Sequence, residues 1–281
     1  MNITAIILAG AVVGIVGLLI AVLLGVASEA FKVPVDEKAV AVREALPGNN
    51  CGGCGYAGCD GLAAAIAKGE APVNACPVGG AAAAAEISSI MGVEAGEAVK
   101  MVAFVKCAGT CDRAKDKYEY VGTPDCVAAA TIPGGGAKAC SFGCTGLGTC
   151  VKACQFDAIH VVDGVAVVDK DKCVACGKCA SMCPKGMIEM VPYDAKVLVQ
   201  CNSHDMGKNV KAVCSAGCIG CQLCKKTCKF EAVEIDRFLA HIDYSKCKNC
   251  TACAMKCPTG IIQTPKKPAG VKFEKPAPKA E

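Results

Sequence analysis

The feature that most constrains this chain is a run of four cysteines followed by proline, which occurs twice. The pattern is C-x2-C-x2-C-x3-C-P, at Cys173–Pro184 and Cys247–Pro258. Three thiolates two residues apart can wrap one face of an iron–sulfur cubane, and a fourth ligand must come from elsewhere. Structural zinc sites use two separated cysteine pairs instead of runs of three plus one. The spacing therefore favours [4Fe–4S] clusters over zinc.

An internal repeat surrounds these two runs. Cysteines of the two copies match one another at a single constant offset: Cys140/Cys214, Cys144/Cys218, Cys150/Cys224, Cys154/Cys228 and Cys173/Cys247. In the first copy, two β-rich segments (159–162 and 165–168) flank Asp163-Gly164, a dipeptide typical of a hairpin turn. The chain is therefore predicted to carry two copies of one two-cluster module.

The composition also requires a bound cofactor. The chain has 281 residues, 25 of them cysteine, with no Trp and 4 % aromatic residues. Small domains with so few large apolar side chains bury too little surface to be stable alone. A disulfide framework is the alternative, but the cysteine triplets and the odd total speak against it.

The formal net charge of +4 counts every cysteine as neutral. A [4Fe–4S]2+ core with four thiolates carries about −2 overall, so several clusters would make the loaded protein acidic. The basic balance of the bare sequence is therefore no argument for a nucleic-acid partner.

A different cysteine group precedes the repeat. Its pattern is C-x2-C-x4-C-x16-C-P, and its members are Cys51, Cys54, Cys59 and Cys76. Four cysteines suffice for one further cluster, and the glycines of NNCGGCGYAGCDG allow backbone N–H groups to approach its sulfurs. Tetrahedral zinc remains an alternative for this group, since it also takes four cysteines.

The N-terminus is predicted to be a transmembrane anchor. Residues 3–27 contain no charged side chain, and as a helix they would extend about 37 Å, enough to cross a bilayer. A signal peptide would have a basic start and a shorter apolar stretch. Lys32, Lys38 and Arg43 follow the span, so the positive-inside rule predicts cluster domains on the cytoplasmic side of the plasma membrane.

We therefore expect an α+β chain of five parts. An N-terminal transmembrane helix is followed by a small [4Fe–4S] domain and two tandem bacterial-type 2[4Fe–4S] ferredoxin-like modules. The boundaries are 1–28 for the anchor, 29–99 for linker and single-cluster domain, 100–191 and 192–264 for the modules with their preceding segments, and 265–281 for a Pro- and Lys-rich disordered tail.

Residues 132–191 and 213–262 resemble two-cluster bacterial ferredoxins. In that family the fourth cysteine of each run ligates the other cluster. The resemblance implies four ligand sets: Cys154 with Cys173, Cys176 and Cys179; Cys183 with Cys140, Cys144 and Cys150; Cys257 with Cys218, Cys221 and Cys224; and Cys228 with Cys247, Cys250 and Cys253. Leu147 stands where the repeat has Cys221, so we expect Cys140 to replace that ligand.

Five [4Fe–4S] clusters are expected in all, and a sixth is left open. Five cysteines remain unassigned: Cys107, Cys111, Cys126, Cys201 and Cys214. Cys107 and Cys201 end similar strand-like segments, VAFVKC and KVLVQC. The set favoured for a sixth cluster is Cys107, Cys126, Cys201 and Cys214. The alternative is spare buried thiols, because free cysteine packs well as a small apolar residue.

The order of anchor, single-cluster domain and ferredoxin modules resembles the B subunit of the Rnf complex, a membrane-bound ferredoxin:NAD+ oxidoreductase. The similar stretches are NNCGGCGYAGCDGLA, CSFGCTGLGTCVKACQFDAI and VCSAGCIGCQLCKKTC. The resemblance implies an electron-transfer subunit that takes electrons from soluble reduced ferredoxin and passes them to other membrane and flavin-bearing subunits. It would belong to a translocase-type enzyme without a bond-making site of its own, so no catalytic residue is assigned.

The sequence leaves two alternatives open. The related reducing system uses such a subunit to keep a redox-sensing transcription factor reduced. A cluster subunit of another membrane oxidoreductase, such as a hydrogenase, is the second alternative, although such polyferredoxin subunits usually lack the Cys51–Cys76 domain.

Overall fold

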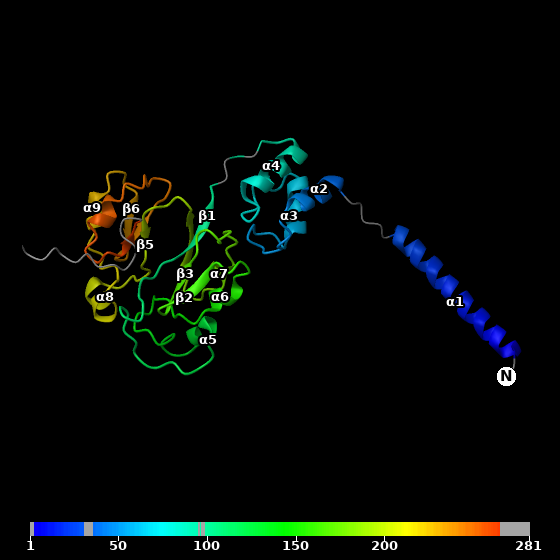
Figure 1. The fold of residues 1–281 in the computed structure, drawn as a ribbon, viewed down its shortest axis with the longest axis horizontal. Coiled ribbons are helices and arrows are strands. Elements are labelled where there is room, and N and C mark those ends of the chain that lie inside the picture. Colours follow the sequence, from blue (N-terminus) through cyan, green and yellow to red (C-terminus); the bar gives the residue numbers. More distant parts are fainter. Residues whose placement is uncertain (1–2, 31–35, 95, 97–98, 265–281) are drawn as a thin grey trace, which may run out of the picture.

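The computed structural model describes residues 3–30, 36–94, 96 and 99–264. Its first element is helix α1 (Ile3–Ala30), which lies apart from the other elements (Figure 1). Within it, the 19 residues Gly10–Ser28 have a mean hydropathy of 2.7, and none of that window is buried. The helix has the length and composition to cross a membrane, as the sequence predicts.

Three helices form a small unit after the anchor: α2 (Glu37–Ala45), α3 (Cys59–Ala67) and α4 (Gly80–Met91). They share a core built on Val42, Leu62 and Ile87. The last of these helices ends at Met91. It stops because Gly92 adopts a left-handed conformation, which caps the helix and turns the chain away.

The first ferredoxin-like module contains two antiparallel strand pairs. Strand β1 (Met101–Val105) pairs with β4 (Ile188–Pro192), and β2 (Ile159–Val162) pairs with β3 (Val165–Val168). The predicted hairpin is confirmed, and positive φ angles at both Asp163 and Gly164 allow its two-residue turn. Three short helices complete the module: α5 (Cys126–Thr131), α6 (Thr149–Ala153) and α7 (Lys178–Ser181).

The second module repeats this plan. Strand β5 (Leu198–Val199) pairs with β8 (Ile262–Gln263), and β6 (Val233–Asp236) pairs with β7 (Leu239–Ile242). Its helices are α8 (Gly207–Val213), α9 (Leu223–Thr227) and α10 (Ala252–Met255). The strand pairing is shared as well. Val105 faces Ile188 in the first module, and Val199 faces Ile262, the repeat equivalent of Ile188, in the second.

Backbone and ring contacts join the two modules. Lys115 N donates to the Val213 carbonyl at 2.9 Å, and Ala114 forms a β-bridge with Cys214. The rings of Phe142 and His204 meet edge to face, with centroids 5.7 Å apart. The two modules therefore form one packed body (Figure 1).

The α+β class, the apolar N-terminal helix, the iron–sulfur domain and the two ferredoxin-like modules are confirmed. The predicted disordered tail, 265–281, lies outside the described residues. Cysteines make up part of the apolar core of both modules, so a cofactor bound to them would lie inside the structure.

Candidate metal centres

The cysteine group beside the anchor surrounds the start of α3. Cys54, Cys59 and Cys76 share the core of the helical unit, and Cys51 precedes them in the same glycine-rich loop. Asn50 fixes this loop by accepting a hydrogen bond from Cys59 N at 2.8 Å. Gly79 N donates to Cys76 Sγ at 3.3 Å. Burial raises the pKa of Cys76, and the neighbouring thiols Cys59 and Cys54 raise it further.

In the first module, one predicted set lines a single pocket. Its members are Cys154, Cys173, Cys176 and Cys179. Ala103 N, on β1, donates to Cys173 Sγ at 3.4 Å. Such N–H···S bonds stabilise the more negative state of a cluster and so raise its reduction potential.

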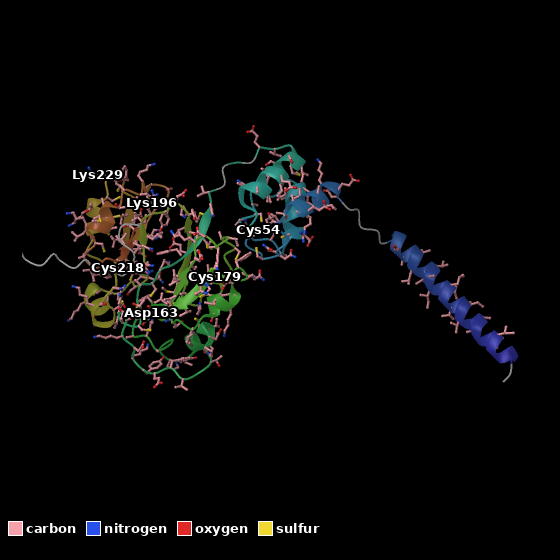
Figure 2. The ribbon with its side chains drawn as sticks, viewed as in Figure 1. Cys54, Asp163, Cys179, Lys196, Cys218 and Lys229 are labelled. Carbon is pink, nitrogen blue, oxygen red and sulfur yellow. The ribbon has the colours of Figure 1, made fainter. Side chains whose placement is uncertain are left out.

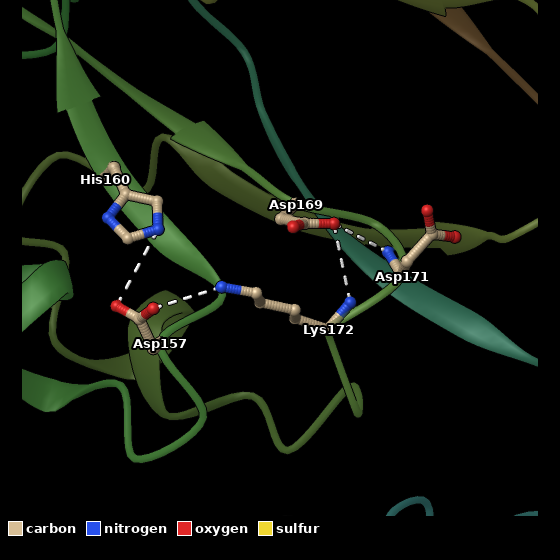
Figure 3. A network of polar contacts seen from close by, with 5 residues as sticks. All are labelled: Asp157, His160, Asp169, Asp171 and Lys172. Atoms are coloured by element: carbon tan, nitrogen blue, oxygen red, sulfur yellow. Dashed lines mark hydrogen bonds and ion pairs between the residues drawn. The ribbon is translucent and has the colours of Figure 1, made fainter.

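An aspartate shapes the loop that leads into this set, as Figure 3 shows. Asp169 Oδ1 accepts hydrogen bonds from Asp171 N at 3.0 Å and Lys172 N at 3.5 Å. The Asp169 carbonyl also accepts a hydrogen bond from Cys173 N at 3.1 Å. The Lys172 ammonium reaches Asp157 at 3.1 Å, and His160 lies 3.7 Å from the same carboxylate. The loop is thus held in shape independently of any cofactor.

The second module uses the same device. Asp243, the repeat equivalent of Asp169, accepts from Ser245 N at 3.0 Å, and its carbonyl accepts from Cys247 N at 3.0 Å. Hydrogen bonds from Ser245 and Lys246 hold the pKa of Asp243 down, at about 2. The loop chemistry is therefore repeated together with the cysteine spacing.

Two pockets in the second module gather the two predicted sets. One is lined by Cys218, Cys221, Cys224 and Cys257, and the other by Cys228, Cys247, Cys250 and Cys253. Helices α9 and α10 pack against each other between these sets. Cys221 and Cys250 are exposed to solvent, so each set reaches the surface at one corner.

The remaining first-module set differs from the prediction. The pocket beside Cys144, Cys150 and Cys183 is completed by Cys126, and Cys140 does not line it. Cys126 thus lies in the pocket where the sequence led us to expect Cys140.

Hydrogen bonds explain why Cys126 takes this place. Asp125 caps α5, and its carboxylate accepts from the Thr149 hydroxyl at 2.9 Å. The same hydroxyl accepts from Cys126 N at 2.6 Å, which fixes Cys126 at the start of α6. Although burial opposes it, hydrogen bonds from Thr145 and Thr149 hold the pKa of Cys126 below its usual value.

Cys140 lies instead with three of the cysteines that no standard spacing explains. Cys107, Cys140, Cys201 and Cys214 line one pocket between the two modules. The set favoured from the sequence contained Cys126 in place of Cys140, whereas in the structure each of these two cysteines lines the pocket expected for the other. The repeat held a signal for this, because Cys140 and Cys214 are equivalent positions in the two copies.

The donor sets suit a four-iron core. Zinc bound by thiolates at about 2.3 Å needs its four sulfurs close together, whereas a cubane places each thiolate on a separate iron. In the described part of the chain, no three His, Cys, Asp or Glu side chains converge tightly enough for a single metal ion. Wider four-cysteine pockets with N–H donors to sulfur fit [4Fe–4S] clusters, which supply one-electron redox chemistry when bound.

Three family models for iron–sulfur domains match parts of the chain. Residues 46–78 match the family model "Putative Fe-S cluster", residues 166–189 the "4Fe-4S binding domain", and residues 217–261 the "4Fe-4S dicluster domain". None of the three matches includes Cys107, Cys126, Cys140, Cys201 or Cys214.

Three curated relatives cover most of the chain. The B subunit of the Na(+)-translocating ferredoxin:NAD(+) oxidoreductase complex of Acetobacterium woodii is 46 % identical over 89 % of this chain and 75 % of its own length. The B subunit of the ion-translocating oxidoreductase complex of Methanosarcina acetivorans is 43 % identical over 90 % of this chain and 96 % of its own. The B subunit of the proton-translocating ferredoxin:NAD(+) oxidoreductase complex of Clostridium ljungdahlii is 41 % identical over 90 % of both chains.

Proposed function

Because this chain belongs to the family of B subunits of the Rnf-type ion-translocating oxidoreductase complexes, we propose that it carries electrons for a membrane-bound ferredoxin:NAD+ oxidoreductase. It takes electrons from soluble reduced ferredoxin and relays them through [4Fe–4S] clusters to flavin-bearing and membrane subunits. Each cluster gains one electron and loses one, and no covalent bond forms or breaks on this subunit. Ion translocation takes place in the partner subunits.

Five ligand sets belong to this proposal. They are Cys51, Cys54, Cys59 and Cys76; Cys126, Cys144, Cys150 and Cys183; Cys154, Cys173, Cys176 and Cys179; Cys218, Cys221, Cys224 and Cys257; and Cys228, Cys247, Cys250 and Cys253. The observation that carries the function is that neighbouring sets touch. Gly53, in the loop of the Cys51–Cys76 set, packs against the backbone of Cys176. Cys150 lies near Cys179: burial raises the pKa of Cys150 most, and the nearby Cys179 thiol raises it further.

Ferredoxin is proposed to dock on the second module. Both of its cluster sets reach solvent, at Cys221 and Cys250. Lys225, Lys226 and Lys229 are exposed on and after α9 (Figure 2 labels Lys229). Positive side chains beside an exposed cluster corner attract an acidic electron carrier and speed its encounter.

The anchor sets the location. Helix α1 spans the plasma membrane, and the cluster modules lie on the cytoplasmic side, as the lysines and arginine after the span indicate. The proposed five-part division of the chain follows the same order, from anchor through single-cluster domain to the two modules.

The test uses membranes from cells with and without this subunit. Ferredoxin-dependent NAD+ reduction is expected to disappear when the subunit is deleted and to return with the wild-type chain. The Cys111→Ala variant is the matched control, because Cys111 belongs to no set, and it should restore activity fully. Unchanged NAD+ reduction in the deletion strain would refute the proposal and would direct attention to the reduction of a transcription factor.

A further inference from the structure

Four cysteines from two separate modules line one pocket at the interface between them. They are Cys107 and Cys140 from the first module and Cys201 and Cys214 from the second. We propose that these four cysteines bind a sixth [4Fe–4S] cluster, which bridges the two modules. The inference rests on the proposed function only in taking the other clusters to be present, and no family model matches any of these four residues.

The pocket resembles the four pockets of the ferredoxin-like sets, because four cysteines line each of them. Cys107 Sγ and Cys214 Sγ lie 3.5 and 3.6 Å from the point where Gly109 would carry a Cβ. Sulfurs from the two modules therefore face each other across the pocket, and Gly109 leaves the space between them open.

The set consists of two equivalent pairs. Cys140 and Cys214 match through the internal repeat. Cys107 comes two residues after Val105, which pairs with Ile188. Cys201 likewise comes two residues after Val199, which pairs with Ile262, the repeat equivalent of Ile188. Each module thus contributes two cysteines from corresponding places in its fold to a shared site. Spare thiols would have no reason to converge in this way.

Backbone donors surround the sulfurs, again in equivalent positions. Gly109 N donates to Cys107 Sγ at 3.4 Å, and Ser203 N donates to Cys201 Sγ at 3.5 Å. Cys218 N adds a second bond to Cys201 Sγ at 3.3 Å. Donors of this kind stabilise metal-bound thiolates, as they do in the sets that the ferredoxin spacing explains.

Positive charge also lies next to the pocket. Lys138 is buried and lines it, with its ammonium donating to the Gly164 carbonyl at 2.8 Å and to Gly109. Lys106 lines it too. Four thiolates around a [4Fe–4S]2+ core carry about −2, and a buried ammonium compensates part of that charge.

Without metal, these thiols are poor anions. Burial raises the pKa of Cys201 to about 12 and also raises the pKa values of Cys140 and Cys214. Iron binding replaces all four thiol protons, which leave to solvent. The geometry identifies the site, and this chemistry explains why the pocket is an unfavourable place for free thiolates.

One further group points into the site. Gln200 lines the pocket, and its side-chain oxygen is buried with no hydrogen-bond partner among the described residues. Rotating the amide by half a turn would direct its NH2 group there instead, since the two orientations are not distinguished by shape. The sulfides of a cluster would accept that hydrogen bond.

The position gives the cluster a role. Cys201 lies against Cys218, a proposed ligand in the second module. Cys107 lies near Cys144 of the first module: burial raises the pKa of Cys144, and the Cys107 thiol raises it further. The bridging cluster therefore adjoins one cluster of each module. It provides the step by which an electron crosses from one module to the other.

The test is to count iron and sulfide in anaerobically reconstituted full-length protein. Six clusters give about 24 Fe per chain and five give about 20. Wild type and the control Cys111→Ala are expected near 24 Fe. The pair Cys140→Ala with Cys214→Ala removes two ligands from one site and should leave about 20 Fe. The single exchange Cys214→Ala leaves three ligands and should yield a three-iron cluster with its own EPR signal in the oxidised protein.

A mixed pair separates this assignment from the one expected by sequence. Cys126→Ala with Cys214→Ala damages two different sites, so it should lose two clusters, to about 16 Fe, or form two three-iron clusters. If the Cys126/Cys214 pair lost only one cluster and the Cys140/Cys214 pair lost two, the assignment of Cys140 to the bridging site would be refuted. Cys126 would then belong to the bridging site and Cys140 to the Cys144 set. Wild type with about 20 Fe, with or without one zinc, would overturn the sixth cluster and leave the proposed activity untouched.

Discussion

Lys138 offers the sharpest electrostatic test of the cluster arrangement. It is a buried lysine, 6 % exposed, that lines the pocket of the proposed bridging cluster. Burial raises the pKa values of Cys144 and Cys214, and the Lys138 charge lowers both of them in opposition. One ammonium therefore acts on the ligands of two neighbouring clusters, and replacing it with neutral glutamine should change both potentials.

The magnitude follows from the position of the charge. Reduction adds one negative charge to a cluster, which the ammonium stabilises. At roughly 8 Å and an effective dielectric constant of about 20, that attraction amounts to about 2 kcal/mol. For a one-electron couple, with about 59 mV for each tenfold change in equilibrium constant, the loss corresponds to a fall of roughly 90 mV in midpoint potential. The positive charge of Lys138 fixes the direction of this change in potential.

Glutamine is chosen over methionine because it keeps an amide donor for the carbonyls of Gly109 and Gly164. Leaving a buried carbonyl without a donor costs about 1–3 kcal/mol, which would confuse a change of potential with a change of stability. The matched control is Lys115→Gln, since Lys115 is exposed on the neighbouring segment and its charge is screened by water.

The assay is an EPR-monitored redox titration of the purified full-length protein. Two clusters should become harder to reduce in Lys138→Gln, and none should move in Lys115→Gln. Iron content is measured on the same samples, so that loss of a cluster is not mistaken for a shift. If Lys138→Gln keeps its iron and all its potentials, the buried lysine does not lie beside clusters and the arrangement is wrong.

Three further outcomes are expected. Gly53→Val should slow electron transfer between the Cys51–Cys76 cluster and the first module without loss of iron, because a Cβ at Gly53 would lie 2.6 Å from the Cys176 carbonyl oxygen. The transfer is measured by rapid-mixing kinetics, and Gly61→Ala is the control, because a Cβ at Gly61 would lie 3.8 Å from its nearest neighbour. In cells that lack the partner subunits, deleting residues 3–30 should release the protein from membranes with its iron intact, and a deleted form that still sediments with membranes there would argue against a spanning α1. Removing iron with a chelator should abolish the cooperative thermal unfolding transition followed by circular dichroism, since cysteines form part of the core of both modules. A transition that survives would show that the cores are stable without clusters.

Much of this architecture could be predicted because its signals are local. The C-x2-C-x2-C-x3-C-P run fixes three ligands on one loop, and the flanking Asp169 or Asp243 sets the conformation of that loop within a few residues. The hairpin at Asp163-Gly164 is equally local, because two adjacent residues with positive φ determine it. Such features can be predicted from the sequence because the residues that determine the conformation lie in the short segment that adopts it.

The exchange of Cys126 and Cys140 could not be read in this way. Cys126 reaches its pocket through the hydrogen bonds among Asp125, Thr149 and its own backbone, which join positions more than twenty residues apart. Spacing along the chain places Cys140 near Cys144, but in the structure the two cysteines line different pockets. The better signal was the symmetry of the repeat, which pairs Cys140 with Cys214 and thereby points to a site shared between modules.

That shared site changes what the duplication means. Two separate ferredoxin modules would each carry electrons between their own two clusters, and a second copy would add capacity without reach. With a bridging cluster, the cluster sites form one series. It begins at the exposed Cys250 and Cys221 of the second module, crosses the interface and the first module, and ends at the Cys51–Cys76 set. Figure 2 shows Cys218, Cys179 and Cys54 in this order. The duplication then extends one linear path from a surface that ferredoxin can reach to the domain next to the membrane. In such a path every cluster is essential, so losing the bridging cluster alone should stop electron flow while five other clusters still assemble.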